Sequence, residues 1–192
     1  FTAHAGSLIE TQLYSGDMAS ALAIAQSQAE ADPADVEAQE MWIDLLVMTG
    51  QVQKAEALTS QRVHDAPSDP NAHYLHARAA TTARDSRIRY ERALRIDPEH
   101  GRSFMGMASV HEAEGRADDA LAAYQNAVAR DSGLEEAWMG VIRQHLMRND
   151  GAAARTAVRQ GLESVPDAGG MYLVLALIEP QRAESVLREG LK

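Results

Sequence analysis

Four histidines are the residues of this sequence whose spacing most resembles that of a chemical site. His73 and His76 lie three residues apart, a spacing at which two imidazoles on one helical face can share a metal ion. His111 and His145 stand at equivalent places in two adjacent repeating segments. No third ligand accompanies His73 and His76 at a convincing spacing, so we expect packing histidines and no metal.

Other catalytic patterns are weak. The sequence contains no cysteine, which excludes thiolate metal sites and cysteine nucleophiles. The glycine-rich segment PDAGG at 166–170 lacks a preceding strand and a following Lys, so it indicates a loop and not a phosphate cradle. We therefore expect no cofactor and no enzymatic activity.

The charge balance narrows the choice of partner. The 192 residues include 28 acids and 18 basic residues, a net charge of −10, and the acids are concentrated in residues 1–69. Such a chain is poorly suited to nucleic acid or to an anionic membrane surface. No apolar run is long enough to span a bilayer, so no membrane insertion is expected. Phe1 stands where an initiator Met would, which indicates a processed form or a fragment.

The elements that position these residues recur with a period. Apolar and small residues reappear about 34 residues apart, a period that predicts stacked helix hairpins. The stretch 101–134 contains two helical stripes separated by Gly115. The equivalent pairs are Ala21 and Ala55, Ala120 and Ala154, Pro33 and Pro67, and Trp138 and Tyr172.

These hairpins define six units in a single domain over residues 1–192. The units at 70–100 and 169–192 are shortened at the turn between their helices, where length changes are tolerated best. The predicted units are 2–35, 36–69, 70–100, 101–134, 135–168 and 169–192.

The register of these units resembles the tetratricopeptide repeat (TPR) family. The stretch FMGMASVHEAEGRADDALAAYQNAVARD within 97–131 and the segment RYERALRIDP at 89–98 carry the resemblance most clearly. It implies an all-α, right-handed superhelical solenoid of about six antiparallel hairpins. It also implies that the first helix of each unit lines a concave groove that binds a protein or peptide.

The groove positions implied by the resemblance fall into two zones. The N-terminal zone is acidic and would suit a basic segment of the partner. The second zone contains an apolar anchor around Tyr74, Met105 and Met139. The predicted groove residues are Glu10, Glu37, Glu40, Asp44, Asn71, Tyr74, Arg78, Arg102, Met105, Ser109, Glu112, Met139, Arg143 and Met147.

The segment ARDSRIRYERALR at 83–95 is the most basic in the chain. Taken together, its five arginines do not share one helical stripe, so we expect a solvated face paired locally with Asp85 and Glu91. The alternatives are a phosphate site, a secondary docking face, or a surface that attracts the acidic units of a second copy.

We therefore predict a non-catalytic adaptor or scaffold that binds a partner in its concave groove. The composition, rich in Arg and Ala and poor in Lys, is common in GC-rich bacterial genomes, and similar bacterial repeats often serve envelope complex assembly. The alternatives are a regulatory or substrate-recruiting segment of a larger enzyme, and a homo-oligomer formed through exposed terminal helices.

Overall fold

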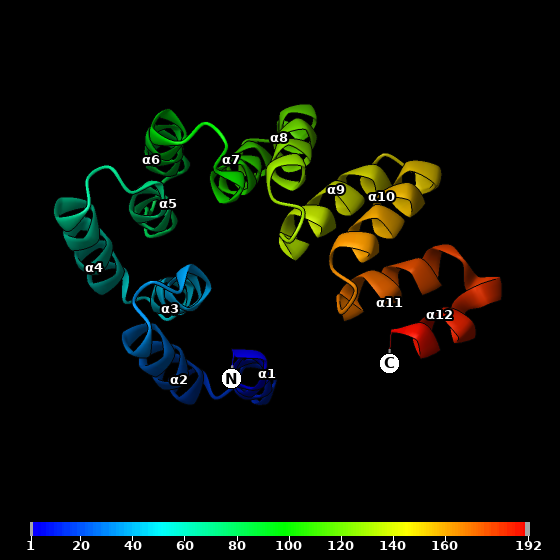
Figure 1. The fold of residues 1–192 in the computed structure, drawn as a ribbon, viewed down its shortest axis with the longest axis horizontal. Coiled ribbons are helices and arrows are strands. Elements are labelled where there is room, and N and C mark those ends of the chain that lie inside the picture. The colour runs from blue at the N-terminus through cyan, green and yellow to red at the C-terminus, as the bar shows by residue number, and fades with distance from the viewer. Residues whose placement is uncertain (1, 191–192) are drawn as a thin grey trace. The chain divides into compact units, whose positions relative to one another are not determined.

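The computed structural model describes residues 2–190, apart from the side chains of residues 2–7 and 10. This part of the chain is all helical and contains no strand (Figure 1). The helices are α1 (Thr2–Ser15), α2 (Met18–Ala31), α3 (Val36–Met48), α4 (Val52–Asp65), α5 (Pro70–Arg78), α6 (Ala83–Ile96), α7 (Gly101–Ala113), α8 (Ala117–Arg130), α9 (Glu135–Met147), α10 (Gly151–Ser164), α11 (Gly169–Ile178) and α12 (Ala183–Glu189). A single 3₁₀ turn, Pro180–Arg182, lies between α11 and α12.

The helices form successive hairpins, each made of a first and a second helix. The first helices begin at residues 2, 36, 70, 101, 135 and 169, which are the first residues of the six predicted units. The predicted all-α repeat fold is therefore confirmed.

Backbone conformation ends the first helix of most hairpins. Gly16, Gly50 and Gly115 have φ values of 79°, 77° and 72°, in the left-handed region that suits glycine. Asn149 takes the equivalent place in the next hairpin with φ 57°. Asparagine is among the few other residues that tolerate this region, so the turn survives without glycine.

Aspartates mark where several helices begin. The side chains of Asp17, Asp35, Asp69 and Asp150 each accept a hydrogen bond from a backbone N–H of the helix that follows. A side chain of this kind satisfies an N–H that has no partner within the helix, and it typically contributes about 1 kcal/mol.

The chain divides into two compact units, Phe1–Ile96 (unit 1) and Asp97–Lys192 (unit 2), and each has its own core. In unit 1, Trp42, Ile43 and Leu46 pack against alanines of α2 and α4. In unit 2, Tyr124, Trp138, Ile142 and Met171 belong to one cluster. The expectation of a single domain over the whole chain stays a prediction.

Small residues let neighbouring helices approach closely. The four periodic alanines, Ala21, Ala55, Ala120 and Ala154, are completely buried. Gly140 of α9 lies directly against the ring of Tyr124 from α8. Close approach at these positions brings the larger side chains of adjacent helices into contact, which is where most of the burial energy arises.

No described helix is both long enough and apolar enough to cross a lipid bilayer.

The contact at Gly140 yields a stability prediction. In Gly140→Ala, the new Cβ would lie 2.5 Å from two carbons of the buried Tyr124 ring, so α8 and α9 must separate. We expect the free energy of unfolding of unit 2 to fall by about 1–3 kcal/mol, as for other overpacked cores. Urea denaturation followed by circular dichroism measures this. The control is Gly151→Ala, because a Cβ there meets nothing within 4 Å. Equal losses in both variants would contradict the steric explanation.

Candidate functional site

The predicted acidic zone is largely engaged within unit 1. Arg78 of α5 donates from Nε to Asp44 Oδ1 at 2.8 Å, and its Nη1 lies 3.0 Å from Glu40 Oε1. Its Nη2 also pairs with Asp44. Glu40 is buried and Asp44 is half-buried, so these carboxylates bind the next repeat and are not open to a basic partner. Of the remaining acids in this zone, Glu37 is exposed, and the side chain of Glu10 lies outside the described residues.

The predicted apolar anchor is corrected at two of its three residues. Tyr74 is 0% exposed and Met105 is 4% exposed, so neither can contact a partner in this structure. Tyr74 packs against Tyr90 of α6, with ring centroids 5.9 Å apart, and burial raises its pKa well above the usual value. Met105 is part of the core of unit 2. Both side chains fill space between helices, although the register alone would place them in the groove.

The remaining predicted residues differ in exposure. Asn71, Arg102 and Met139 are half-buried, and Ser109 is exposed. Met147 is exposed at the end of α9.

Glu112 is the centre of a polar network in unit 2. It accepts hydrogen bonds from Arg143 Nη2 at 2.8 Å, from Gln144 Nε2 at 2.7 Å and from Tyr124 Oη at 2.9 Å. Burial tends to raise the pKa of Glu112, but the donors Arg143, Tyr124 and Gln144 outweigh it and lower the pKa. Like the Arg78 cluster, this network joins successive first helices.

Two exposed leucines on α11 escaped the sequence prediction. Leu173 is 57% exposed and Leu177 is 80% exposed, and they lie one helical turn apart. They occupy the same places in their unit as Met139 and Arg143 do in the preceding unit. Applying the groove register to the shortened last unit would have identified both. They extend the exposed apolar surface of the first helices in unit 2.

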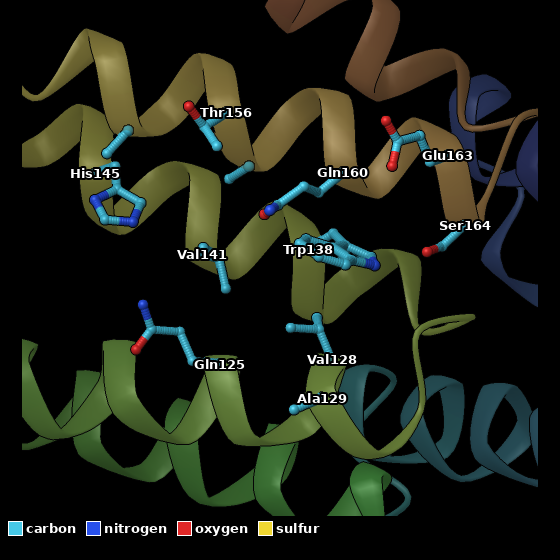
Figure 2. A pocket seen from close by; sticks show the side chains of 12 residues that line it. Gln125, Val128, Ala129, Trp138, Val141, His145, Thr156, Gln160, Glu163 and Ser164 are labelled. Atoms are coloured by element: carbon cyan, nitrogen blue, oxygen red, sulfur yellow. The ribbon is translucent and has the colours of Figure 1, made fainter.

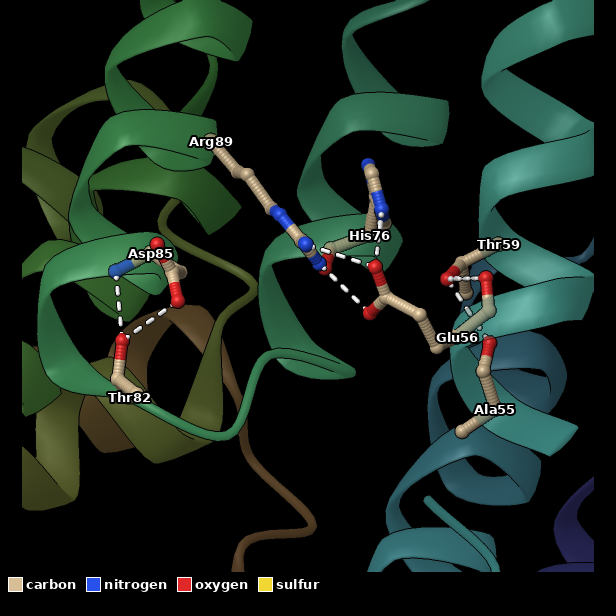
Figure 3. Close-up of polar contacts among 7 residues, drawn as sticks. All are labelled: Ala55, Glu56, Thr59, His76, Thr82, Asp85 and Arg89. Atoms are coloured by element: carbon tan, nitrogen blue, oxygen red, sulfur yellow. Dashed lines mark hydrogen bonds and ion pairs between the residues drawn. The ribbon is translucent and has the colours of Figure 1, made fainter. Parts of the chain in front are cut away.

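A second polar cluster joins α4, α5 and α6 in unit 1 (Figure 3). Arg89 donates to both carboxylate oxygens of Glu56, at 2.7 and 2.8 Å, and to the backbone oxygen of His76 at 2.7 Å. His76 Nε2 lies 3.0 Å from Glu56 Oε1. The hydrogen bonds from Arg89 lower the pKa of Glu56, whereas burial lowers the pKa of His76.

The two closely spaced histidines have different partners. His73 Nε2 lies 2.9 Å from the backbone oxygen of Pro67, away from the Glu56 pair of His76. Within the part of the chain that the structure describes, no group of three or more His, Cys, Asp or Glu side chains could hold a metal ion.

The second helices of unit 2 flank an open hollow of 710 Å³ (Figure 2). Trp138 and Val141 of α9 form its floor, and polar side chains from α8 and α10 line its sides. His145 and Glu163 lie at opposite ends of the hollow, so they do not form an acid–base pair (Figure 2). A second hollow of 530 Å³ lies between α2 and α4 and has Trp42 among its lining residues, so hollows of this kind occur in both units.

The fold defines a helical repeat protein made of successive hairpins. A family model described as "Tetratricopeptide repeat" matches residues 12–79. Together with the repeat fold seen over the described residues, this match over about a third of the chain confirms the resemblance to the tetratricopeptide repeat family that the sequence predicted.

Solved structures show the same fold. A thermophilic TPR protein of Thermus thermophilus, TTC0263, is 17% identical with a TM-score of 0.63, covering 93% of this chain and 98% of that one. The APC/C hetero-tetramer Cut9–Hcn1 matches with 18% identity and a TM-score of 0.65, covering 91% of this chain and 35% of that one. A tetratricopeptide repeat protein from Parabacteroides merdae is 13% identical with a TM-score of 0.54, covering 98% and 78%. No curated protein sequence matches the chain.

The Arg78 cluster yields a second prediction. In Arg78→Met, Glu40 and Asp44 keep their positions but lose their shared cation, which leaves two carboxylates close together in a partly buried site. We expect unit 1 to lose about 2–4 kcal/mol of stability at pH 7, measured by urea denaturation. Arg188→Met is the control, because its exposed pair with Glu184 should contribute less than about 1 kcal/mol. A loss no greater than that of the control would show that the cluster is not stabilising.

The Glu56 cluster predicts acid sensitivity. The pKa of His76 is lower in the folded protein than its usual value near 6.5, so the unfolded chain binds the proton more readily. The stabilisation is complete above pH 6.5 and is lost as the pH falls through the folded-state pKa. We expect the free energy of unfolding to decrease between pH 7.5 and 5.5, and less steeply in His76→Gln. His64→Gln, which removes an exposed histidine, is the control. An unchanged slope in His76→Gln would assign the effect to other groups.

Proposed function

We propose that this protein is a non-catalytic scaffold that holds an apolar segment of a protein partner on the first-helix surface of unit 2. This surface consists of Met139, Arg143, Leu173 and Leu177. The tetratricopeptide fold is generally an interaction repeat and not an enzyme. Beyond this general role, we propose which surface of the chain binds and what kind of segment it binds.

The exposed leucine pair of α11 is the observation that carries the proposal. Arg143, at the place in α9 that Leu177 has in α11, is exposed although a further hairpin follows α9. The exposure of Leu177 is therefore a property of its place in the repeat, which faces away from the neighbouring helices. Burial of two such leucines by a partner would contribute roughly 1–2 kcal/mol each.

Neighbouring residues make the surface suitable for a peptide. Met139 is partly buried, and its Cε lies 4.0 Å from the point where a Cβ on Gly170 would stand, so it extends towards α11. Methionine adapts its shape to different ligands. Arg143 uses Nε and Nη2 for Glu112 and Tyr124, and no bond of its Nη1 is found within the described residues. That edge of the guanidinium group can donate to a peptide carbonyl or carboxylate.

The solved relatives support an assembly role by analogy. The Cut9–Hcn1 structure is a hetero-tetramer, and a chain in it has a fold similar to that of this chain. A role in bacterial envelope assembly stays a prediction that follows from the family resemblance alone. The polar networks of Arg78 and Glu112 connect repeats, which supports a structural role for these charged groups and not a catalytic one.

Comparative affinity capture tests the proposed surface. The native chain and a Leu173→Ser, Leu177→Ser variant are immobilised and exposed to lysate, and the captured proteins are quantified by mass spectrometry. We expect at least one abundant partner to decrease about tenfold or more with the variant, since two apolar contacts are lost.

The control removes an equal number of exposed apolar residues from unit 1, by Tyr14→Ser and Met48→Ser. This control should retain the partner that the first variant loses. Circular dichroism spectra of all three proteins must agree, so that lost capture reports on the surface and not on folding. Identical captured sets from all three proteins would refute the proposal.

A further inference from the structure

Three arginines on α6 differ from all the other arginines that the structure describes. Arg84, Arg92 and Arg95 are exposed, and no hydrogen bond, ion pair or ring contact involves them within the described residues. Every other described arginine interacts with an acid, a backbone oxygen, a ring or another group within the chain. The exceptions are therefore confined to one helix.

These arginines share one face of α6. Arg84, Ile88, Arg92 and Arg95 follow one another at spacings of four, four and three residues, which places them along a single helical stripe. We call these four residues the basic face. The sequence predicts that the five arginines of 83–95 share no single stripe, and the stripe described here contains only three of them. Arg89 is not part of it, because its side chain binds Glu56.

The sequence predicts that Asp85 and Glu91 pair with the arginines of this segment, but neither pairs with an arginine of the basic face. Asp85 accepts a hydrogen bond from Thr82 Oγ1 at 2.7 Å, and its backbone N–H donates to the same hydroxyl, so Thr82 caps α6 and Asp85 is paired with Thr82 (Figure 3). Glu91 lies on the same side of the helix as the basic face but makes no contact with its arginines in the described structure. The basic face retains an excess of positive charge in a chain whose net charge is −10.

The chemistry of this face selects carboxylates. A guanidinium group presents planar pairs of N–H donors that match a carboxylate, and free donors at the surface bind an acid without first breaking an internal bond. Ile88 is 49% exposed in the middle of the face and offers an apolar contact. Arginine is one of the residue types that contribute most to protein interfaces.

Size and net charge favour a polypeptide over other anions. From Arg84 to Arg95 the face extends about 16 Å along the helix, the length of a short peptide segment. A nucleic acid or an anionic bilayer continues beyond this distance and would meet the acidic remainder of the chain. A short acidic segment contacts the basic face alone.

We propose that the basic face binds an acidic segment of a protein partner, with carboxylates opposite the three arginines and an apolar side chain on Ile88. This is a second interaction surface, carried by a second helix of unit 1, and it does not depend on the leucine surface of unit 2. A scaffold with both surfaces can hold two segments at the same time.

Fluorescence anisotropy with defined probes tests the proposal. The probes are two labelled 14-residue peptides, one helical with Glu and Leu at the spacing of the basic face, and one extended with alternating Glu and Leu. A single-stranded oligonucleotide and vesicles containing phosphatidylserine serve as the other anions. We expect at least one peptide to bind the native chain at 50 mM NaCl and to weaken about tenfold at 300 mM.

Matched variants separate this face from general charge effects. Arg84→Gln, Arg92→Gln, Arg95→Gln should weaken peptide binding at least about tenfold. Arg116→Gln, Arg148→Gln, Arg188→Gln changes the net charge equally at arginines that are paired within the chain, and it should weaken binding less than threefold. Ile88→Gln should weaken binding as well, and Leu173→Ser, Leu177→Ser should leave it unchanged. The last variant distinguishes a failure here from a failure of the leucine surface.

Three results would overturn the proposal. One is that neither peptide binds the native chain, and a second is that both triple variants lose the same affinity. The third is tighter binding of the oligonucleotide or the vesicles than of either peptide, which would replace the acidic polypeptide with another class of partner.

Discussion

The close approach of neighbouring helices at small residues is the constraint on which the rest of this structure depends. One helical hairpin cannot bury the apolar stripes of both its helices, so the hairpins within each unit must pack against one another. The buried alanines and the contact between Gly140 and Tyr124 make that packing close enough to exclude water. Larger side chains at these places would separate the helices and expose the aromatic residues between them.

Packing in series also determines where charged groups are placed. The first helices of successive repeats bring Asp44 next to Arg78 and Glu112 next to Arg143, at separations of 34 and 31 residues in the sequence. Charges that would otherwise line a binding surface are thereby used to join repeats. The surfaces that we propose for binding therefore consist of residues that the repeats leave largely without such partners. Leu173 and Leu177 of unit 2 meet this condition, as do Arg84, Arg92 and Arg95 of unit 1.

The fold was predictable from the sequence because it depends on local, repeated signals. The regular spacing of small and apolar residues placed the start of every first helix, and glycine or asparagine ends the first helix in four of the hairpins. The leucines of α11 were also within reach, since the register that identified Met139 and Arg143 identifies them one repeat later. They were missed because the last unit is shortened and its register was not extended that far.

The exposure of individual side chains was less predictable, because it depends on contacts between distant residues. Tyr74 occupies a groove position in the register, yet the ring of Tyr90 covers it within the shortened third hairpin. The sequence likewise gives no indication that Arg89 pairs with Glu56, 33 residues earlier, while Arg84 and Arg92 pair with nothing in the described part of the chain.

This difference explains why the arginines of α6 form a distinct surface only when the structure is known. Seen in sequence, five arginines are scattered around the helix, and their average effect is that of a solvated face. Once Arg87 and Arg89 are engaged within the chain, the remaining three share one side with Ile88. An arginine that stabilises the fold by an internal pair would lose that bond on binding a partner, whereas an unpaired one loses only water. Binding therefore has the smallest free-energy cost at the arginines that have no internal partner.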